Sequence, residues 1–119
     1  MRDFKKYDVW QLGHNLAIKV YKNTIDLPVE EKYGITAQMR RAAYSIPSNF
    51  AEGCGRSGDK EFNRFIQISL GSAHELEYFI LLSRDLFLLT NDICQELEQD
   101  INLIKKKLYS LTLKLKKDA

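Results

Sequence analysis

From Gln38 to Arg56 the chain reads QMRRAAYSIPSNFAEGCGR. Apolar residues recur here every three or four positions, the spacing that places side chains on one face of an α-helix. The apolar positions, beginning just before the stretch, are Ile35, Met39, Ala42, Ile46, Phe50 and Gly53. A polar stripe beside them contains Gln38, Arg41, Ser45, Ser48, Asn49 and Glu52. The pattern predicts an amphipathic helix over roughly residues 35–53.

Pro47 lies in the middle of this predicted helix. A proline inside a helix costs about 3 kcal/mol, because it removes a hydrogen bond and crowds the carbonyl four residues earlier. Two interpretations follow: one continuous, kinked helix, or two helices with Pro47 near the start of the second. Both stripes keep helical spacing across Pro47, which favours the kinked helix. We expect Ser45, Ser48 and Asn49 to satisfy the freed backbone groups.

Three further stretches, approximately residues 7–24, 59–87 and 91–115, also have helical apolar periodicity. In the third helix Gly71 interrupts the pattern, and we expect another helix to pass close to it. The fourth has the most regular spacing, with Ile93, Leu97, Ile101, Ile104, Leu108, Leu111 and Leu115. Four amphipathic helices with short connections predict an all-α fold. We expect an antiparallel up-and-down four-helix bundle with a Pro-kinked second helix, forming a single domain over residues 1–119.

A second polar stripe lies on the third helix, and it includes Arg64, Gln67, Gly71, Glu75 and Tyr78. If the two stripes face each other, Arg41 is expected to pair with Glu75. We favour a structural polar seam, a buried network that fixes the register of the two helices at some cost in stability. Its residues are Gln38, Arg41, Ser45, Pro47, Asn49, Glu52, Gly71 and Glu75. The alternative is a ligand site formed by Arg41, Asn49, Glu52 and Glu75.

The net charge is only +2, from 18 Lys and Arg against 16 Asp and Glu. The last fifteen residues nevertheless hold six lysines against one aspartate, and residues 91–100 hold four acids and no base. The helix macrodipole explains most of this acid-to-base order. The alternative is a basic segment that contacts nucleic acid. The candidate contacts are Arg40, Arg56, Lys105, Lys106, Lys107, Lys114, Lys116 and Lys117.

Signals for catalysis, metal binding and membrane insertion are missing from the sequence. None of the eight glutamates is followed three positions later by histidine, as a di-metal bundle site requires, and His14 and His74 lack partners at ligand spacing. There is no phosphate-binding glycine motif. The start has no secretory signal, and two cysteines fit a reducing compartment. We expect a cytoplasmic, non-enzymatic protein with no cofactor, no metal and no membrane segment.

Four segments together resemble a known bacterial family: Val9 to Gln11, Gly34 to Ala42, Ser45 to Gly53 and Gly71 to Glu77. It is the four-helix-bundle family first met as open reading frames inside intervening sequences of 23S ribosomal RNA genes. Phe50 stands where that family usually has isoleucine. The resemblance implies a left-handed antiparallel bundle that assembles as a homopentamer and has no known enzymatic activity.

A related branch of that family serves as the accessory protein of diversity-generating retroelements, in which a basic pentameric barrel binds reverse transcriptase and nucleic acid. This chain is less basic than that role suggests, so we do not transfer the role whole. Our function hypothesis is a non-enzymatic homopentamer that binds structured RNA or a ribonucleoprotein partner. The alternative is a scaffolding oligomer that binds a protein partner and has no nucleic-acid role.

Overall fold

The computed structural model describes residues 2–118, with the side chains of residues 2–117. These residues form four long helices and two single 3₁₀ turns, Phe4–Lys6 and Val29–Glu31, without a strand. The helices are α1 (Asp8–Asn23), α2 (Ile35–Cys54), α3 (Gly58–Asp85) and α4 (Asn91–Asp118). The predicted all-α fold is confirmed, and the predicted helices agree with the observed ones to within a few residues.

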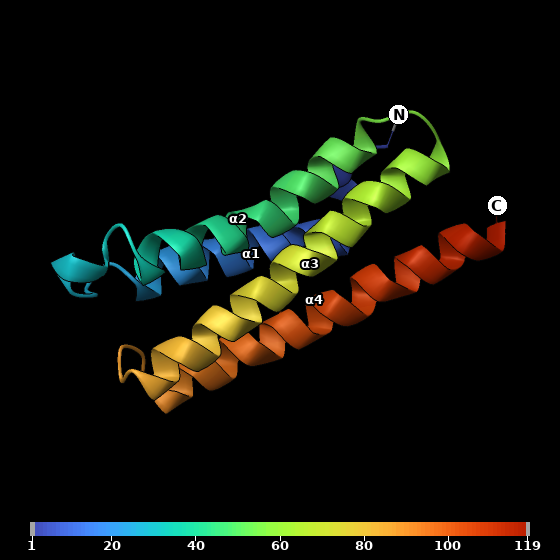
Figure 1. The fold of residues 1–119 in the computed structure, drawn as a ribbon. Coiled ribbons are helices and arrows are strands. Elements are labelled where there is room, and N and C mark those ends of the chain that lie inside the picture. The colour runs from blue at the N-terminus through green and yellow to red at the C-terminus, as the bar shows by residue number, and fades with distance from the viewer. Residues whose placement is uncertain (1, 119) are drawn as a thin grey trace.

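The helices run alternately up and down, and each packs against its neighbours in the sequence (Figure 1). The bundle closes because α1 also packs against α4. It is elongated, with extents of 46 × 22 × 19 Å. The predicted antiparallel four-helix bundle is therefore confirmed.

The core is built from the apolar stripes that the spacing defined. In α4, the side chains of Leu97, Ile101, Ile104 and Leu108 are at most 1% exposed. In α2, Met39, Ala42, Ile46 and Phe50 are equally buried. Burying a side chain of Leu, Ile, Phe or Met contributes about 1.5–3 kcal/mol, so these two helices supply much of the stabilisation of the fold.

The helix α2 continues through Pro47 without interruption. The continuous interpretation is thus confirmed, while the kink stays a prediction. Pro47 is buried against α1: a Cβ added to Gly13 would lie 3.5 Å from Pro47 Cδ and 3.3 Å from Ile46 Cγ2. The missing side chain of Gly13 therefore lets α1 lie close to α2 at Ile46, next to Pro47. The amide of Asn49 donates a 2.8 Å hydrogen bond to the Ser45 carbonyl, not to the Ala43 carbonyl that Pro47 deprives of its usual donor.

The expectation of a close neighbour at Gly71 is wrong. A Cβ at Gly71 would meet no atom within 4 Å, because this residue lies on the outer side of α3. The close approach between α2 and α3 occurs at Gly53 instead. A Cβ there would lie 2.7 Å from Phe65 Cβ and 3.3 Å from Phe62 Cδ1.

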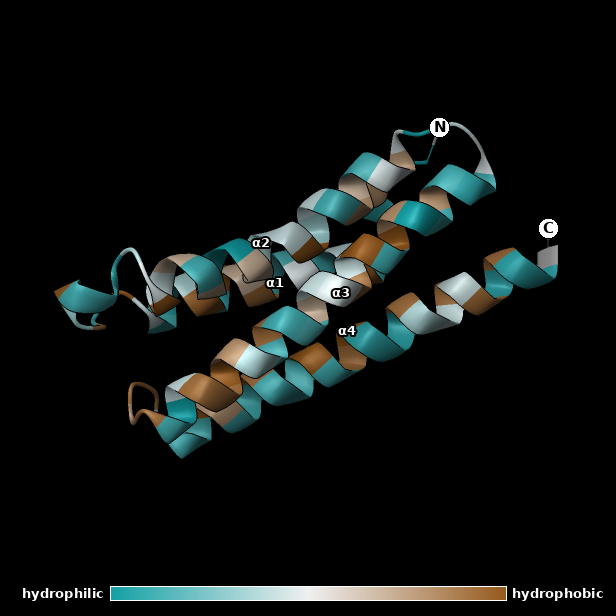
Figure 2. Cartoon of the chain, in the orientation of Figure 1, coloured by the Kyte–Doolittle hydropathy of each residue, from teal (hydrophilic) through white to brown (hydrophobic). Residues whose placement is uncertain are grey.

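The connection between α3 and α4 is apolar, and Figure 2 shows it in brown at one end of the bundle. Its residue Phe87 has a φ of 58°, and its side chain is 93% exposed. A residue with a Cβ pays about 1–2 kcal/mol in this left-handed conformation, whereas glycine does not.

Replacing Phe87 with glycine is expected to raise the free energy of unfolding by about 1 kcal/mol, because strain is removed and almost no buried surface is lost. Urea denaturation at a fixed protein concentration measures this change. A loss of stability would show that the Phe87 side chain makes contacts that the isolated chain lacks.

Candidate nucleic-acid interface

Two of the predicted nucleic-acid contacts are instead committed to ion pairs between helices. The Lys105 ammonium donates to Glu77 on α3 at 2.9 Å, and the Lys107 ammonium donates to Asp8 at the start of α1 at 2.6 Å. The hydrogen bond from Lys107 lowers the pKa of the Asp8 carboxyl. Exposed pairs of this kind each contribute about 0–1 kcal/mol, so their main effect is to align α4 with its neighbours.

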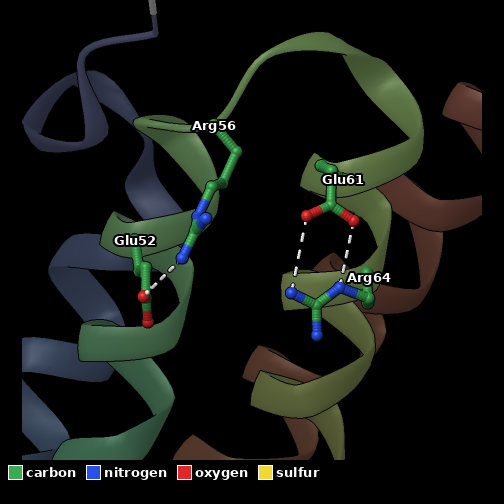
Figure 3. Close-up of polar contacts among 4 residues, drawn as sticks. All are labelled: Glu52, Arg56, Glu61 and Arg64. Atoms are coloured by element: carbon green, nitrogen blue, oxygen red, sulfur yellow. Dashed lines mark hydrogen bonds and ion pairs between the residues drawn. The ribbon is translucent and has the colours of Figure 1, made fainter.

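Two predicted arginine contacts also have partners within the bundle. Arg40 Nε donates to the buried Thr24 hydroxyl at 2.9 Å, and its guanidinium lies 4.5 Å from the centre of the Tyr21 ring. Arg40 thus fastens α2 to the end of α1. Arg56 Nη2 donates to Glu52 at 3.0 Å, beside the similar pair of Arg64 with Glu61 on α3 (Figure 3).

The other four candidates, Lys106, Lys114, Lys116 and Lys117, are exposed and form no ion pair with the side chains of residues 2–117. Lys106, Lys114 and Lys117 follow one another at spacings of eight and three, which places them along one face of α4. Lys106 and Lys114 also line, with Lys107, a groove of about 380 Å³. We call it the α1–α4 groove; it is lined by Tyr7, Asp8, Val9, Leu103, Lys106, Lys107, Ser110, Leu111 and Lys114.

The acidic start of α4 has a second use besides the helix dipole. The Lys19 ammonium of α1 forms ion pairs with Glu96 and Asp100, with N–O distances of 3.1 and 2.9 Å. Glu98 accepts from Arg84 of α3 at 2.7 Å. The acid-to-base order along α4 therefore matches opposite charges on both neighbouring helices, which disfavours a shifted register.

The predicted polar seam lies at the surface rather than inside the bundle. The expected pair of Arg41 and Glu75 is present, with 3.6 Å between Nη2 and Oε1, but both side chains are more than 40% exposed. Gln38, Glu52 and Gly71 are also exposed, whereas Ser45 and Asn49 are half-buried and only Pro47 is buried. The expectation of a buried network is wrong, because long charged side chains reach water from the edge of the α2–α3 contact.

The alternative ligand site does not form as one cluster. Arg41 faces Glu75, Glu52 pairs with Arg56, and Asn49 bonds the Ser45 carbonyl. The four side chains therefore make separate contacts and do not converge on one ligand position.

A polar contact that does fix α2 against α3 comes from Ser69. Its hydroxyl donates a 2.9 Å hydrogen bond to the Ile46 carbonyl, and the residue is fully buried. The sequence places Ser69 in the apolar stripe of α3. A hydroxyl at a core position is the signal that could have identified it.

A second groove, of about 550 Å³, lies between α1 and α2. We call it the α1–α2 groove; it is lined by His14, Ala17, Ile18, Tyr21, Lys22, Ile25, Arg40 and Tyr44. Several of its side chains are large, apolar and exposed.

Both cysteines are buried and form no disulfide. Burial raises the pKa of the Cys54 thiol to about 11 and also raises the pKa of the Cys94 thiol. Since the thiolate is the reactive form, we expect neither thiol to react with a disulfide reagent at pH 8 until the protein unfolds.

The same shift predicts a pH dependence. Folded Cys54 keeps its proton up to about pH 11, whereas its ordinary pKa is 9.0. Its contribution to stability is therefore complete below pH 9 and is lost as the pH rises toward 11. Urea denaturation between pH 8 and pH 11 measures this loss of stability. The predicted lack of thiol reactivity is checked separately: rapid labelling of either cysteine in the folded protein at pH 8, detected by liquid chromatography and mass spectrometry, would contradict it.

Among the side chains of residues 2–117, no group of three or more His, Cys, Asp or Glu is placed to hold a metal ion. No helix in the same residues combines the length and the apolar character that a membrane span needs.

Comparison with known proteins places the chain in a family. A search of curated proteins found no significant match. A crystal structure of a protein of unknown function from the S23 ribosomal protein family of Bacteroides thetaiotaomicron has the same fold, with a TM-score of 0.79 and 22% identity over 87% of this chain and 97% of that one. The family model described as 23S rRNA-intervening sequence protein matches residues 5–110. The chain therefore belongs to the family of 23S rRNA-intervening sequence proteins.

Proposed function

We propose that the protein is a non-enzymatic, cytoplasmic homo-oligomer that binds structured RNA or a ribonucleoprotein partner through α4. The observation that carries this proposal is the row of exposed lysines on one face of α4, namely Lys106, Lys114 and Lys117, which have no acidic partner among residues 2–117. Lysines that neutralise phosphates release counterions and give a sequence-independent affinity for nucleic acid. The family's association with 23S rRNA genes makes structured RNA the first ligand to test.

Oligomer formation is supported by exposed apolar surface on α3. Tyr78 and Leu81 of this helix are 56% and 44% exposed. Contacts between two different surfaces of identical subunits build a closed ring when the rotation between subunits closes, and a homopentamer is the ring that the family resemblance implies. Five copies would multiply a weak basic patch, because linked sites raise avidity without new contacts. Light scattering should give a mass five times that of the chain, and a monomer mass would contradict this part of the proposal.

The RNA proposal is tested by removing the lysines of α4. Changing Lys106, Lys114 and Lys117 together to glutamine is expected to weaken binding of a hairpin from 23S rRNA at least about tenfold in fluorescence anisotropy. The matched control changes Lys6, Lys32 and Lys60, which are exposed elsewhere, to glutamine. Equal losses in both variants would show that net charge alone, not the α4 face, determines binding.

A scaffolding role with a protein partner is the second candidate. It is favoured by apolar side chains at the end of the bundle that carries the α1–α2 and α3–α4 connections (Figure 1). Val29 and Tyr33 are 82% and 87% exposed, and Phe87 is 93% exposed. Recovery of one stoichiometric protein without RNA, from a pull-down in the native host, would favour this role.

A further inference from the structure

We propose that the α1–α2 groove binds unpaired nucleotides of RNA, with bases stacked on Tyr21 and Tyr44. This inference rests on the proposed RNA-binding function and names a second contact surface for it. The α4 lysines supply attraction to phosphates, whereas this groove would read the single-stranded parts of a structured RNA.

The first support is the set of aromatic rings that the groove presents. Tyr21 and Tyr44, on facing helices, are 42% and 47% exposed. His14 lines the same groove, and its ring stacks in parallel on Trp10 with 5.1 Å between the ring centres. Exposed rings at the rim of a groove are the platform on which proteins stack nucleotide bases. The groove volume of about 550 Å³ also lies within the range of small-molecule sites.

The second support is the charge of the groove. Lys22 and Arg40 line it, and none of its lining residues is acidic. Arg40 is held in place by its hydrogen bond to Thr24, and its guanidinium lies over the Tyr21 ring. A cation fixed beside an aromatic ring suits a ligand in which a phosphate follows a base. A groove with positive charge and no carboxylate fits a polyanion better than it fits a second copy of this nearly neutral chain.

The position of the groove also fits a structured RNA. The helix α1 lines both grooves, through Asp8 and Val9 in the α1–α4 groove and through residues from His14 to Lys22 in the α1–α2 groove. The α4 lysines and the tyrosines thus flank the same helix. An RNA with a paired stem and an unpaired flank can contact both surfaces of one subunit.

The test compares two RNA probes of equal charge, a short unstructured oligonucleotide and a blunt hairpin whose loop is a structured tetraloop with stacked bases. Tyr44→Leu keeps an apolar side chain but removes the ring, and it is expected to weaken binding of the unstructured probe about 5- to 150-fold while hairpin binding is unchanged. Tyr44→Phe keeps the ring and should bind as the wild type does. Tyr33→Leu, at a tyrosine that is 87% exposed in the connection between α1 and α2, is the matched control outside the groove.

Trp10 gives a second readout, because it is the only tryptophan and stacks on His14. The unstructured probe should change its fluorescence, and Tyr44→Leu should abolish that change. The inference is overturned if Tyr44→Leu binds the unstructured probe normally, or if it instead lowers the oligomer mass in light scattering, which would make the groove a contact between copies. In either case hairpin binding that depends on the α4 lysines leaves the proposed function standing. A wild-type protein that binds neither probe overturns both.

Discussion

Phe62→Ala is expected to lower the free energy of unfolding by about 3–5 kcal/mol. Phe62 is 1% exposed and joins three parts of the chain. Its ring centre lies 5.6 Å from that of Phe50 on α2 and 6.2 Å from that of Tyr7, which precedes α1. The Arg2 guanidinium covers the ring at 4.1 Å. Alanine would leave a cavity where α2, α3 and the N-terminal segment meet.

Urea denaturation followed by circular dichroism measures this loss at a fixed protein concentration, because the stability of an oligomer depends on concentration. The matched control is Phe87→Ala, which truncates a phenylalanine that is 93% exposed. That change should alter stability by less than about 0.5 kcal/mol. Similar losses for both variants would contradict the burial that the structure assigns to Phe62.

Gly53→Ala is expected to destabilise the protein by about 1–3 kcal/mol, although alanine is the better helix former. The added methyl group would lie 2.7 Å from Phe65 Cβ, which is part of a helix and cannot rotate away. The helices α2 and α3 must then separate or shift.

Gly71→Ala is the control, since its methyl group would enter open space. That variant should gain about 0.5–1 kcal/mol from helix propensity alone. Alanine is thus expected to lower the free energy of unfolding at Gly53 and to raise it at Gly71, in the same assay. A stabilised Gly53→Ala would show that α2 and α3 are farther apart than the structure places them. Loss of stability in Gly71→Ala would instead show that another subunit packs against the outer side of α3.

The sequence alone was sufficient to predict the four helices and the buried face of each one. Apolar spacing alone identifies residues such as Leu97, Ile101 and Ile104 of α4 as core, and all three are buried. The reason is that burial of one helical face is a local pattern, which the chain must repeat every three or four residues.

Close approaches between helices could not be predicted in the same way, because they depend on which residues meet from two distant segments. Gly71 was expected to admit a neighbour and faces open space, whereas Gly13 and Gly53 are the positions where helices touch. Gly13 lies four positions after Val9, on the core face of α1. A glycine on the core face of a helix was therefore the sequence feature that could have indicated this close approach.

The candidate interface was predicted only in part, because ion pairs between helices are not visible in one helix at a time. Lys105 and Lys107 are as basic in the sequence as Lys106, yet they face acids on α3 and α1. Lys106, which lies between them in the sequence, has an exposed side chain. Helical spacing separates these three consecutive residues by about 100° each, which explains the difference only once the adjoining helices are known.

The most direct test of the proposed function is the salt dependence of hairpin binding. The wild-type association constant should fall steeply as salt rises, and the variant with Lys106, Lys114 and Lys117 changed to glutamine should have a log–log slope shallower by about 2–3, close to one unit for each lost phosphate contact. Absence of binding at low salt, or an identical slope in the two proteins, would contradict the assignment of RNA binding to α4.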